Sequence, residues 1–384
     1  MSAAVSPPEV LVVGGGVVGL GVAWRLGQQG VRVTVLERGE AGRGASWAAA
    51  GMLAPVAELG FEELDLYALS RESLRHWPAF ARDLEAATGR SVDYRDDGTL
   101  VVAPDRDAAE ALRRSFRFQQ QHGVDVRWLS RDAALDLEPF LSPRIAAAVH
   151  APGDHQVDNR RLVTALRAAV EDAASVTVQE HVAVRAIHPD ADAPRAVLDD
   201  GSEIAARQVV LAAGAWSGGV EGLAPVEVPV RPVKGQMLSL RMDAPVAGPP
   251  FGLRHVVRSP DAYLVPKSDG RLVIGATSEE QAFDTRVTAG GLYRLLEGAW
   301  EACPGIDDLD VIETWAGLRP ASRDHAPLLG PLAPGVVAAT GHYRHGILLT
   351  PVTADEIAAL TLARLRDADH TADVLAPFAP TRFA

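Results

Sequence analysis

The chain has 384 residues, of which 47% are hydrophobic and 23% charged, as expected for a globular protein with room for two domains. Its net charge of −13 argues against a nucleic-acid partner and against an anionic membrane surface. The single cysteine, Cys303, cannot form an intramolecular disulfide, and no stretch is apolar enough to predict a membrane-spanning helix.

The N-terminal residues 1–9 lack the basic flank of a signal peptide, so we expect a cytoplasmic protein. An apolar run at 9–13 predicts a buried strand, and helical spacing of apolar residues predicts a helix from Val17 to Gln29. A second strand is expected at 31–37. These three elements predict a right-handed βαβ unit.

Three glycines, Gly14, Gly16 and Gly19, lie between the first strand and the helix with the spacing G-x-G-x-x-G. Gly14 permits the tight turn, Gly16 lets a diphosphate approach the backbone, and Gly19 lets the helix pack on the strand. Glu37 ends the second strand, where an acidic residue accepts hydrogen bonds from an adenosine ribose. The pattern predicts a bound ADP moiety of either NAD or FAD, and the alternative is a packing turn beside a surface glutamate.

The rest of the chain mixes helices with hairpins. Helices are expected at 61–86, 106–122, 159–175 and 289–303, and strands at 98–104, 124–130, 176–188, 195–214, 262–267 and 271–277, and from residue 336. A last helix is expected at 353–367, with Thr353 and Glu356 spaced as a capping box. This order predicts an α/β fold: a doubly wound, Rossmann-like nucleotide-binding domain with an antiparallel-sheet domain inserted.

Several segments resemble, in the same order, the D-amino-acid oxidase-like FAD-dependent oxidoreductases. They include GASWAAAGML, PVKGQML, YLVPKSDGRLVIGAT, WAGLRPASRDHAPLLG and GHYRHGILLTP, and the likeness runs from residue 9 to about 365. The resemblance implies non-covalent FAD and the oxidation of an amine next to a carboxylate. Within the family the chain is most similar to the enzymes that oxidise glycine for thiazole synthesis in thiamine production.

The resemblance also implies the cofactor site. Val17 and Val18 would meet the diphosphate, the segment 211–214 would lie beside the cofactor, and no metal is implied. The complete set of implied cofactor residues is Gly14, Gly16, Val17, Val18, Gly19, Glu37, Arg38, Ala45, Ser46, Ala50, Gly51, Met52, Val182, His342, Tyr343, Arg344, His345, Gly346, Ile347 and Leu348.

The substrate site implied by the resemblance contains Arg319, Tyr263 and Arg344, and the flavin itself carries the chemistry. The guanidinium fork of Arg319 can grip a carboxylate at two points, and the Tyr263 hydroxyl would bind the same group. The alternatives are a structural arginine, a core tyrosine and, at Arg344, a surface charge. Asp261, Ser278 and His345 depart from the family pattern, so the choice among glycine, sarcosine and small D-amino acids stays open.

The expected reaction converts glycine or a similar small amine and dioxygen into an oxoacid, ammonia and hydrogen peroxide. Open alternatives are a D-amino-acid dehydrogenase with another electron acceptor, a non-catalytic flavin-binding protein, and an NAD-dependent dehydrogenase. We also expect a homo-oligomer. The expected FAD-binding domain comprises 1–85, 146–220 and 318–384, and the substrate-binding domain comprises 86–145 and 221–317.

Overall fold

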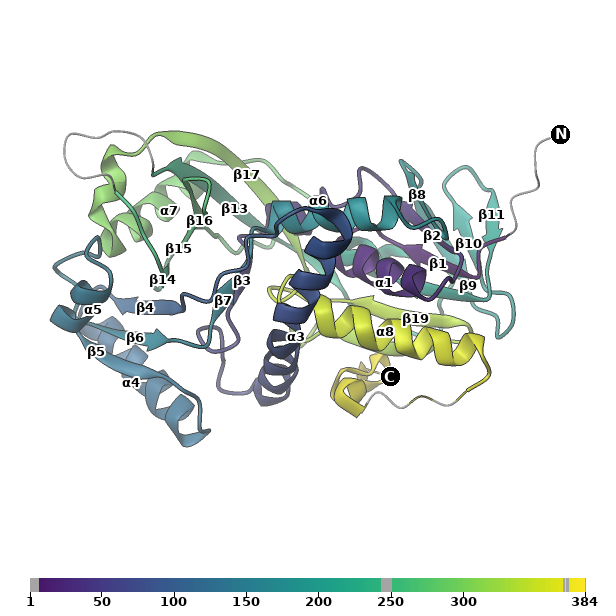
Figure 1. Ribbon diagram of the computed structural model, residues 1–384, viewed down its shortest axis with the longest axis horizontal. Coiled ribbons are helices and arrows are strands. Elements are labelled where there is room, and N and C mark those ends of the chain that lie inside the picture. Colours follow the sequence, from purple (N-terminus) through teal and green to yellow (C-terminus); the bar gives the residue numbers. More distant parts are fainter. Residues whose placement is uncertain (1–6, 243–250, 369, 371–372, 384) are drawn as a thin grey trace.

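The computed structural model describes residues 7–242, 251–368, 370 and 373–383. The N-terminal residues 1–6, where no signal peptide is expected, lie outside the described residues. Figure 1 shows an elongated molecule with two lobes, each built around its own large sheet. Among the described residues, no helix combines the length and the apolar character that crossing a membrane requires.

The expected βαβ unit is confirmed as β1 (Val10–Val13), α1 (Val17–Gln28) and β2 (Val33–Glu37). β1 lies at the centre of a six-stranded sheet and pairs in parallel with both β2 and β12. The strand order is β18-β19-β12-β1-β2-β8, and only β18 runs antiparallel to its neighbour. The added strands are β8 (Val176–Glu180), β12 (Gln208–Leu211), β18 (Leu328–Ala333) and β19 (Val336–Thr340).

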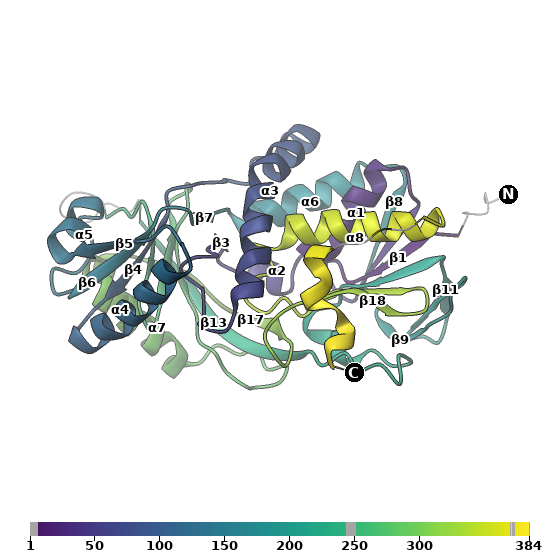
Figure 2. The same cartoon turned by 90° about the horizontal axis from the view of Figure 1, so that it is seen from below.

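Both faces of this sheet are covered. Val10 and Val12 of β1 pack into the core beneath the helices, and Leu11 and Val13 pack into the core on the opposite face. Figure 2 shows the helices gathered on one side: α1, α3 (Leu64–Thr88), α6 (Asn159–Glu171) and α8 (Thr350–Leu365). The other face carries the small antiparallel sheet of β9 (Val184–His188), β10 (Arg195–Leu198) and β11 (Glu203–Ala205). Because every β1 side chain is buried, the strand has an uninterrupted apolar sequence.

The second lobe contains an eight-stranded sheet with the order β17-β13-β16-β15-β14-β4-β6-β5. All neighbouring strands are antiparallel except β14 and β4. The sheet is built from β4 (Thr99–Ala103), β5 (Arg127–Ser130), β6 (Ala147–Ala151), β13 (Arg231–Arg241), β14 (Val256–Arg258), β15 (Tyr263–Pro266), β16 (Arg271–Gly275) and β17 (Val311–Ala321). Its helices are α4 (Arg106–Gln121), α5 (Arg131–Leu137) and α7 (Ala289–Ala302). The two sheets confirm the expected fold class.

Short elements lie between the lobes. They are α2 (Ala45–Ala48), β3 (Met52–Leu53), β7 (His155–Gln156) and the 3-10 helix η1 (Gly214–Gly219). β3 and β7 pair with each other as a two-stranded ribbon. The remaining 3-10 turns are η2 (Pro304–Asp308), η3 (Asp373–Phe378) and η4 (Pro380–Phe383).

The prediction of a capping box at Thr353 is wrong. α8 begins three residues earlier, at Thr350, because Pro351 is tolerated in a first helical turn, where its missing N–H would have no intrahelical partner. Thr353 therefore lies within the helix, and its hydroxyl contacts His342 Nε2 at 3.1 Å. The expected division into domains stays a prediction, although β6, just beyond the boundary at 146, pairs within the eight-stranded sheet.

Candidate active site

The glycine-rich turn uses its three glycines in two different ways. Gly14 has a φ of +109°, and a side chain there would collide with the Ala212 carbonyl oxygen. A side chain at Gly19 would collide with the Gly14 carbonyl oxygen. Gly16 has no such backbone conflict, since a Cβ there would lie 3.2 Å from Ser46 Oγ. The chain itself therefore requires Gly14 and Gly19, whereas Gly16 keeps open a space beside the helix.

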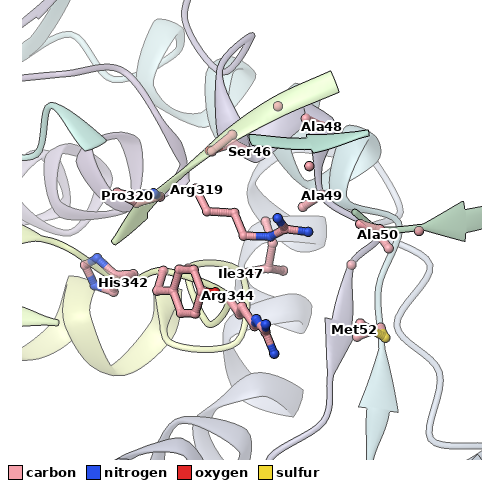
Figure 3. Close-up of a pocket in the computed structure, with 18 of the residues that line it drawn as sticks. Ser46, Ala48, Ala49, Ala50, Met52, Arg319, Pro320, His342, Arg344 and Ile347 are labelled. Carbon is pink, nitrogen blue, oxygen red and sulfur yellow. The ribbon is translucent and has the colours of Figure 1, made fainter. Parts of the chain in front are cut away.

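That space belongs to a cavity whose lining includes the start of α1, β15 and β17; Figure 3 labels ten of the lining residues. Small and apolar lining residues include Gly16, Val17, Val18, Ala45, Ala48, Ala49, Ala50, Gly51, Met52, Ala212, Gly214, Met237, Ala339, Gly346 and Ile347. Polar and charged lining residues include Ser46, Glu58, Arg258, Asp261, Tyr263, Ser278, Arg319, Thr340, His342, Tyr343 and Arg344. Both lobes contribute to its walls, and most of the residues expected to contact the cofactor lie along it.

Two side chains already hold the backbone amides of the turn. Val17 N–H donates to Ser46 Oγ at 3.0 Å, and Gly15 N–H donates to Glu37 Oε2 at 2.8 Å. Glu37 Oε1 also accepts from Gly39 N–H at 2.8 Å. Because Ser46 accepts through its oxygen, its hydroxyl proton can be donated into the cavity. Each Glu37 oxygen has a further lone pair for a ribose, although Glu37 does not line the cavity.

The other expected cofactor residues that do not line the cavity include Arg38, Val182, His345 and Leu348. Arg38 is exposed and lies 4.6 Å from the centroid of the Trp216 ring. Val182 N–H donates to the Glu37 carbonyl at 2.8 Å, and Leu348 is buried in the core beneath the helices. These residues shape the surroundings of the cavity, and their contact with a cofactor stays a prediction.

Arg319 lies on β17 and extends its guanidinium toward Ala49 and Ala50 (Figure 3). Nη1 donates to the Thr277 carbonyl at 3.0 Å. Within the described part of the chain, no carboxylate lies in ion-pairing distance of Arg319. The guanidinium rests on Gly235, where a Cβ would be only 2.5 Å from Nη1. A structural salt bridge therefore does not account for Arg319, and its charge is available to an anionic ligand.

Tyr263 begins β15, as expected, and its hydroxyl faces Met237 Sδ at 3.5 Å. Burial raises the pKa of its phenol, so Tyr263 remains a hydrogen-bond donor at neutral pH. Arg344 is exposed and lines both this cavity and an outer cavity beside α7. Arg344 therefore lies where the two cavities meet, and its contact with substrate stays a prediction.

A partly buried ion pair in the wall of the cavity was not predicted. Glu58 Oε1 accepts from Arg258 Nη1 at 2.7 Å, and both residues line the cavity. Glu58 follows β3 in a loop, and Arg258 ends β14, so the pair joins segments 200 positions apart in sequence. Neither residue lies in a recognisable motif, and no signal in the sequence would have joined them.

A buried lysine stabilises the small-residue wall, which is the part of the cavity lining formed by Ala48, Ala49, Ala50 and Gly51. Lys267 Nζ donates to the carbonyl oxygens of Ala50 and Val157, each at 2.7 Å. Burial lowers the pKa of Lys267 to about 8. Gly51 has a φ of +80°, and a side chain there would collide with the Val157 carbonyl, so this segment has little freedom to move.

A glycine-rich βαβ turn that opens onto a cavity is typical of a dinucleotide-dependent enzyme, and the available guanidinium suits an anionic ligand. Comparison with known proteins specifies the class. A family model described as FAD dependent oxidoreductase matches residues 9–360. The chain therefore belongs to the FAD-dependent oxidoreductase family, and an NAD-dependent dehydrogenase is excluded.

Individual relatives cover nearly the whole chain. Glycine oxidase of Geobacillus kaustophilus is 38% identical over 97% of this chain and 97% of its own length. The crystal structure of glycine oxidase from that organism matches with a TM-score of 0.88 and 35% identity, over 98% of this chain and 99% of the other. The bifunctional protein ThiO/ThiG of Synechocystis is 38% identical over 98% of this chain, which spans 54% of that longer protein.

The residues present fit FAD. Gly16 and the Ser46 hydroxyl provide space and a donor at the start of α1, where a diphosphate would also meet the positive end of the helix. The run Ala48–Ala50 presents only methyl side chains to the cavity, which suits contact with a flat ring. FAD bound there would lie between the glycine-rich turn and Arg319.

Proposed function

We propose that the protein oxidises glycine, or a similar small amine such as sarcosine or a small D-amino acid, with FAD and dioxygen. The products are an oxoacid, ammonia and hydrogen peroxide. The observation that carries the proposal is Arg319, a guanidinium without a carboxylate partner among the described residues, in the lining of the same cavity as the glycine-rich turn. The near full-length similarity to glycine oxidases supports the same reaction.

In the proposed mechanism the chain binds and orients the substrate. Arg319 holds the substrate carboxylate at two points, and the Tyr263 hydroxyl donates to it. The methyl side chains of Ala48, Ala49 and Ala50 leave room in the cavity for a small substrate. Bound FAD supplies the acceptor for the substrate hydride and the site at which dioxygen is reduced.

Most of the proposed cofactor contacts lie along the cavity. Val17, Val18, Ala45 and Ser46 would hold the diphosphate. Ala50, Gly51, Met52 and the segment 342–348 would contact the flavin, while Glu37, Arg38 and Val182, outside the cavity lining, would hold the ribose and adenine. Gly14 and Gly19 support this site through the geometry of the turn.

The test mixes the purified holoenzyme with glycine, sarcosine and D-alanine in separate anaerobic cuvettes. We expect bleaching of the visible flavin absorbance, and stoichiometric hydrogen peroxide once air is admitted. An unbleached flavin with all three amines would contradict the proposal. Bleaching without peroxide formation in air would instead indicate a dehydrogenase.

We further propose a role in thiazole synthesis for thiamine, supported by the similarity to ThiO/ThiG proteins. A homo-oligomer and a cytoplasmic location stay predictions. Light scattering of the purified protein measures the oligomeric state directly.

A further inference from the structure

An amino acid substrate carries two opposite charges, and Arg319 accounts for only one of them. The substrate ammonium also needs a partner when it leaves water, since an unpaired buried charge is costly. Two carboxylates line the described part of the cavity, those of Glu58 and Asp261. These two carboxylates differ in burial and in the partners that each already has.

Glu58 has one oxygen occupied and one available. Oε1 accepts from Arg258 Nη1 at 2.7 Å, whereas Oε2 lies 3.7 Å from His345 Nδ1, which is too far for a hydrogen bond. His345 Nδ1 itself has no hydrogen-bond partner. The Glu58 side chain is 11% exposed, so Oε2 is a mostly buried acceptor to which none of the described residues donates.

Glu58 also remains charged and close to the carboxylate anchor. Although burial opposes ionisation, the charges of Arg258, His345, Arg344 and Arg319 together lower the pKa of Glu58 below its ordinary value. Both Glu58 and Arg319 act on the phenol of Tyr263 as well. One cavity therefore holds a cationic anchor and a stable carboxylate within electrostatic range of each other.

Asp261 is placed differently. It is exposed and lies where the cavity meets the outer cavity, which is also lined by Glu279, Arg294 and Glu297. An ammonium beside Asp261 would remain in water and would gain little from the charge.

We propose that Glu58 Oε2 accepts a hydrogen bond from the substrate ammonium, opposite the carboxylate held by Arg319. This contact selects amino acids over hydroxy acids of the same shape. The inference rests on the proposed function for the ligand class, and it assigns to Glu58 a role in substrate binding, not in the transfer of hydride.

The test uses two ligands that lack a hydrogen on Cα and so cannot be oxidised there. 2-Aminoisobutyrate has an ammonium, and 2-hydroxyisobutyrate has a hydroxyl at the same place. Binding of each to the holoenzyme is measured by calorimetry. Because the contact is a charge-assisted hydrogen bond, Glu58→Gln should weaken 2-aminoisobutyrate binding by about tenfold or more and should not weaken 2-hydroxyisobutyrate.

Asp261→Asn is the matched control, since it removes the other carboxylate, and it should change either affinity by less than about twofold. A selective loss in Asp261→Asn alone would assign the ammonium to Asp261 and overturn the proposal. Equal weakening of both ligands by Glu58→Gln would also overturn it, because the effect would then be structural. If Glu58→Gln does not retain FAD, Glu58→Asp supplies the same test with the charge kept and the oxygen withdrawn.

Failure of the proposed function would look different. If glycine does not bleach the flavin of the wild-type holoenzyme, but Glu58→Gln selectively weakens 2-aminoisobutyrate binding, glycine oxidation is contradicted while the Glu58 contact is supported. A wild-type holoenzyme that oxidises glycine, with Glu58→Gln binding both ligands as before, would contradict only the Glu58 contact.

Discussion

Individual residues of the site were predictable where a motif constrains them. Arg319 and Tyr263 lie in segments that resemble known relatives, and both line the cavity as expected. Glu58 and Arg258 were missed because their pairing depends on tertiary structure, and a charged residue in a loop is normally a solvated one. Leu348, also expected beside the flavin, packs into the core beneath the helices, and its contact with the flavin stays a prediction.

Replacing Arg319 tests the carboxylate anchor. Arg319→Ala should raise KM for glycine by about a hundredfold or more, because a charge-assisted, two-point contact is lost. Visible absorbance should show that FAD is retained, since the adjoining contacts of the glycine-rich turn are unchanged. Arg344→Ala, at the exposed entrance, is the control and should have a smaller effect. A normal KM in Arg319→Ala would refute the assignment.

Gly235 offers a gentler test of the same anchor. A Cβ at this position would lie 2.5 Å from Arg319 Nη1 and 2.7 Å from Cζ, so Gly235→Ala must displace the guanidinium. We expect steady-state kinetics to show a KM for glycine raised by about tenfold, with the flavin spectrum unchanged. Gly252→Ala should behave as wild type, because a Cβ there would have no atom of the described residues within 4 Å.

At the scale of elements, short apolar runs and the helical spacing after Val17 predicted the βαβ unit, and the turn signal at 268–270 predicted the hairpin of β15 and β16. The long strands β13 and β17 were not predicted. Lys234 and Gln236 are buried within β13, and much of β17 is only partly buried, so neither strand shows clean alternation. The start of α8 was misplaced because a threonine–glutamate spacing occurs inside helices as well as at their ends.

The turn between β1 and α1 separates two kinds of glycine. Gly16→Val should fold normally, because the extended φ of −75° suits valine, but its side chain would enter the space beside Ser46. We expect a folded, colourless protein by circular dichroism and visible absorbance. Gly19→Val should instead reduce folded yield, since its side chain meets backbone. A fully yellow Gly16→Val protein would contradict this account.

The small-residue wall depends on one lysine. Lys267→Met removes the donor to the Ala50 and Val157 carbonyls, and leaving these buried acceptors unpaired should cost about 2 kcal/mol of unfolding free energy. Thermal unfolding of the holoenzyme measures the loss. Arg286→Ala, which breaks an exposed ion pair with Asp284, should leave the midpoint unchanged.

The whole molecule contains a buried carboxyl that links its stability to pH. Asp154 accepts from Val56 N–H at 2.9 Å and Ala57 N–H at 3.0 Å, yet burial raises its pKa to about 7. Between pH 4 and 7 the folded chain binds more protons at this group than the unfolded chain. Its contribution to stability therefore falls as pH rises, by up to about 1.4 kcal/mol per pH unit.

Asp154→Asn should remove that dependence. Unfolding of variant and wild type at pH 5 and pH 7 gives the difference, and the free-energy gap between them should change with pH in the stated direction. A gap that is constant across this range would show that Asp154 titrates outside it.

The paired strands β13 and β17 have a consequence for how the enzyme receives its substrate. Their ladder runs from Arg231 opposite Ala321 to Leu240 opposite Val311, and β17 also contacts α2 and η1 at the base of the other lobe. Swinging the lobes apart would break the contacts of β17 with α2 and η1 but leave this ladder intact, so we expect those contacts to oppose an opening of the whole molecule. We therefore expect substrate and product to pass through local movements near Arg344. The exposed Arg344 side chain lies where the inner cavity meets the outer cavity.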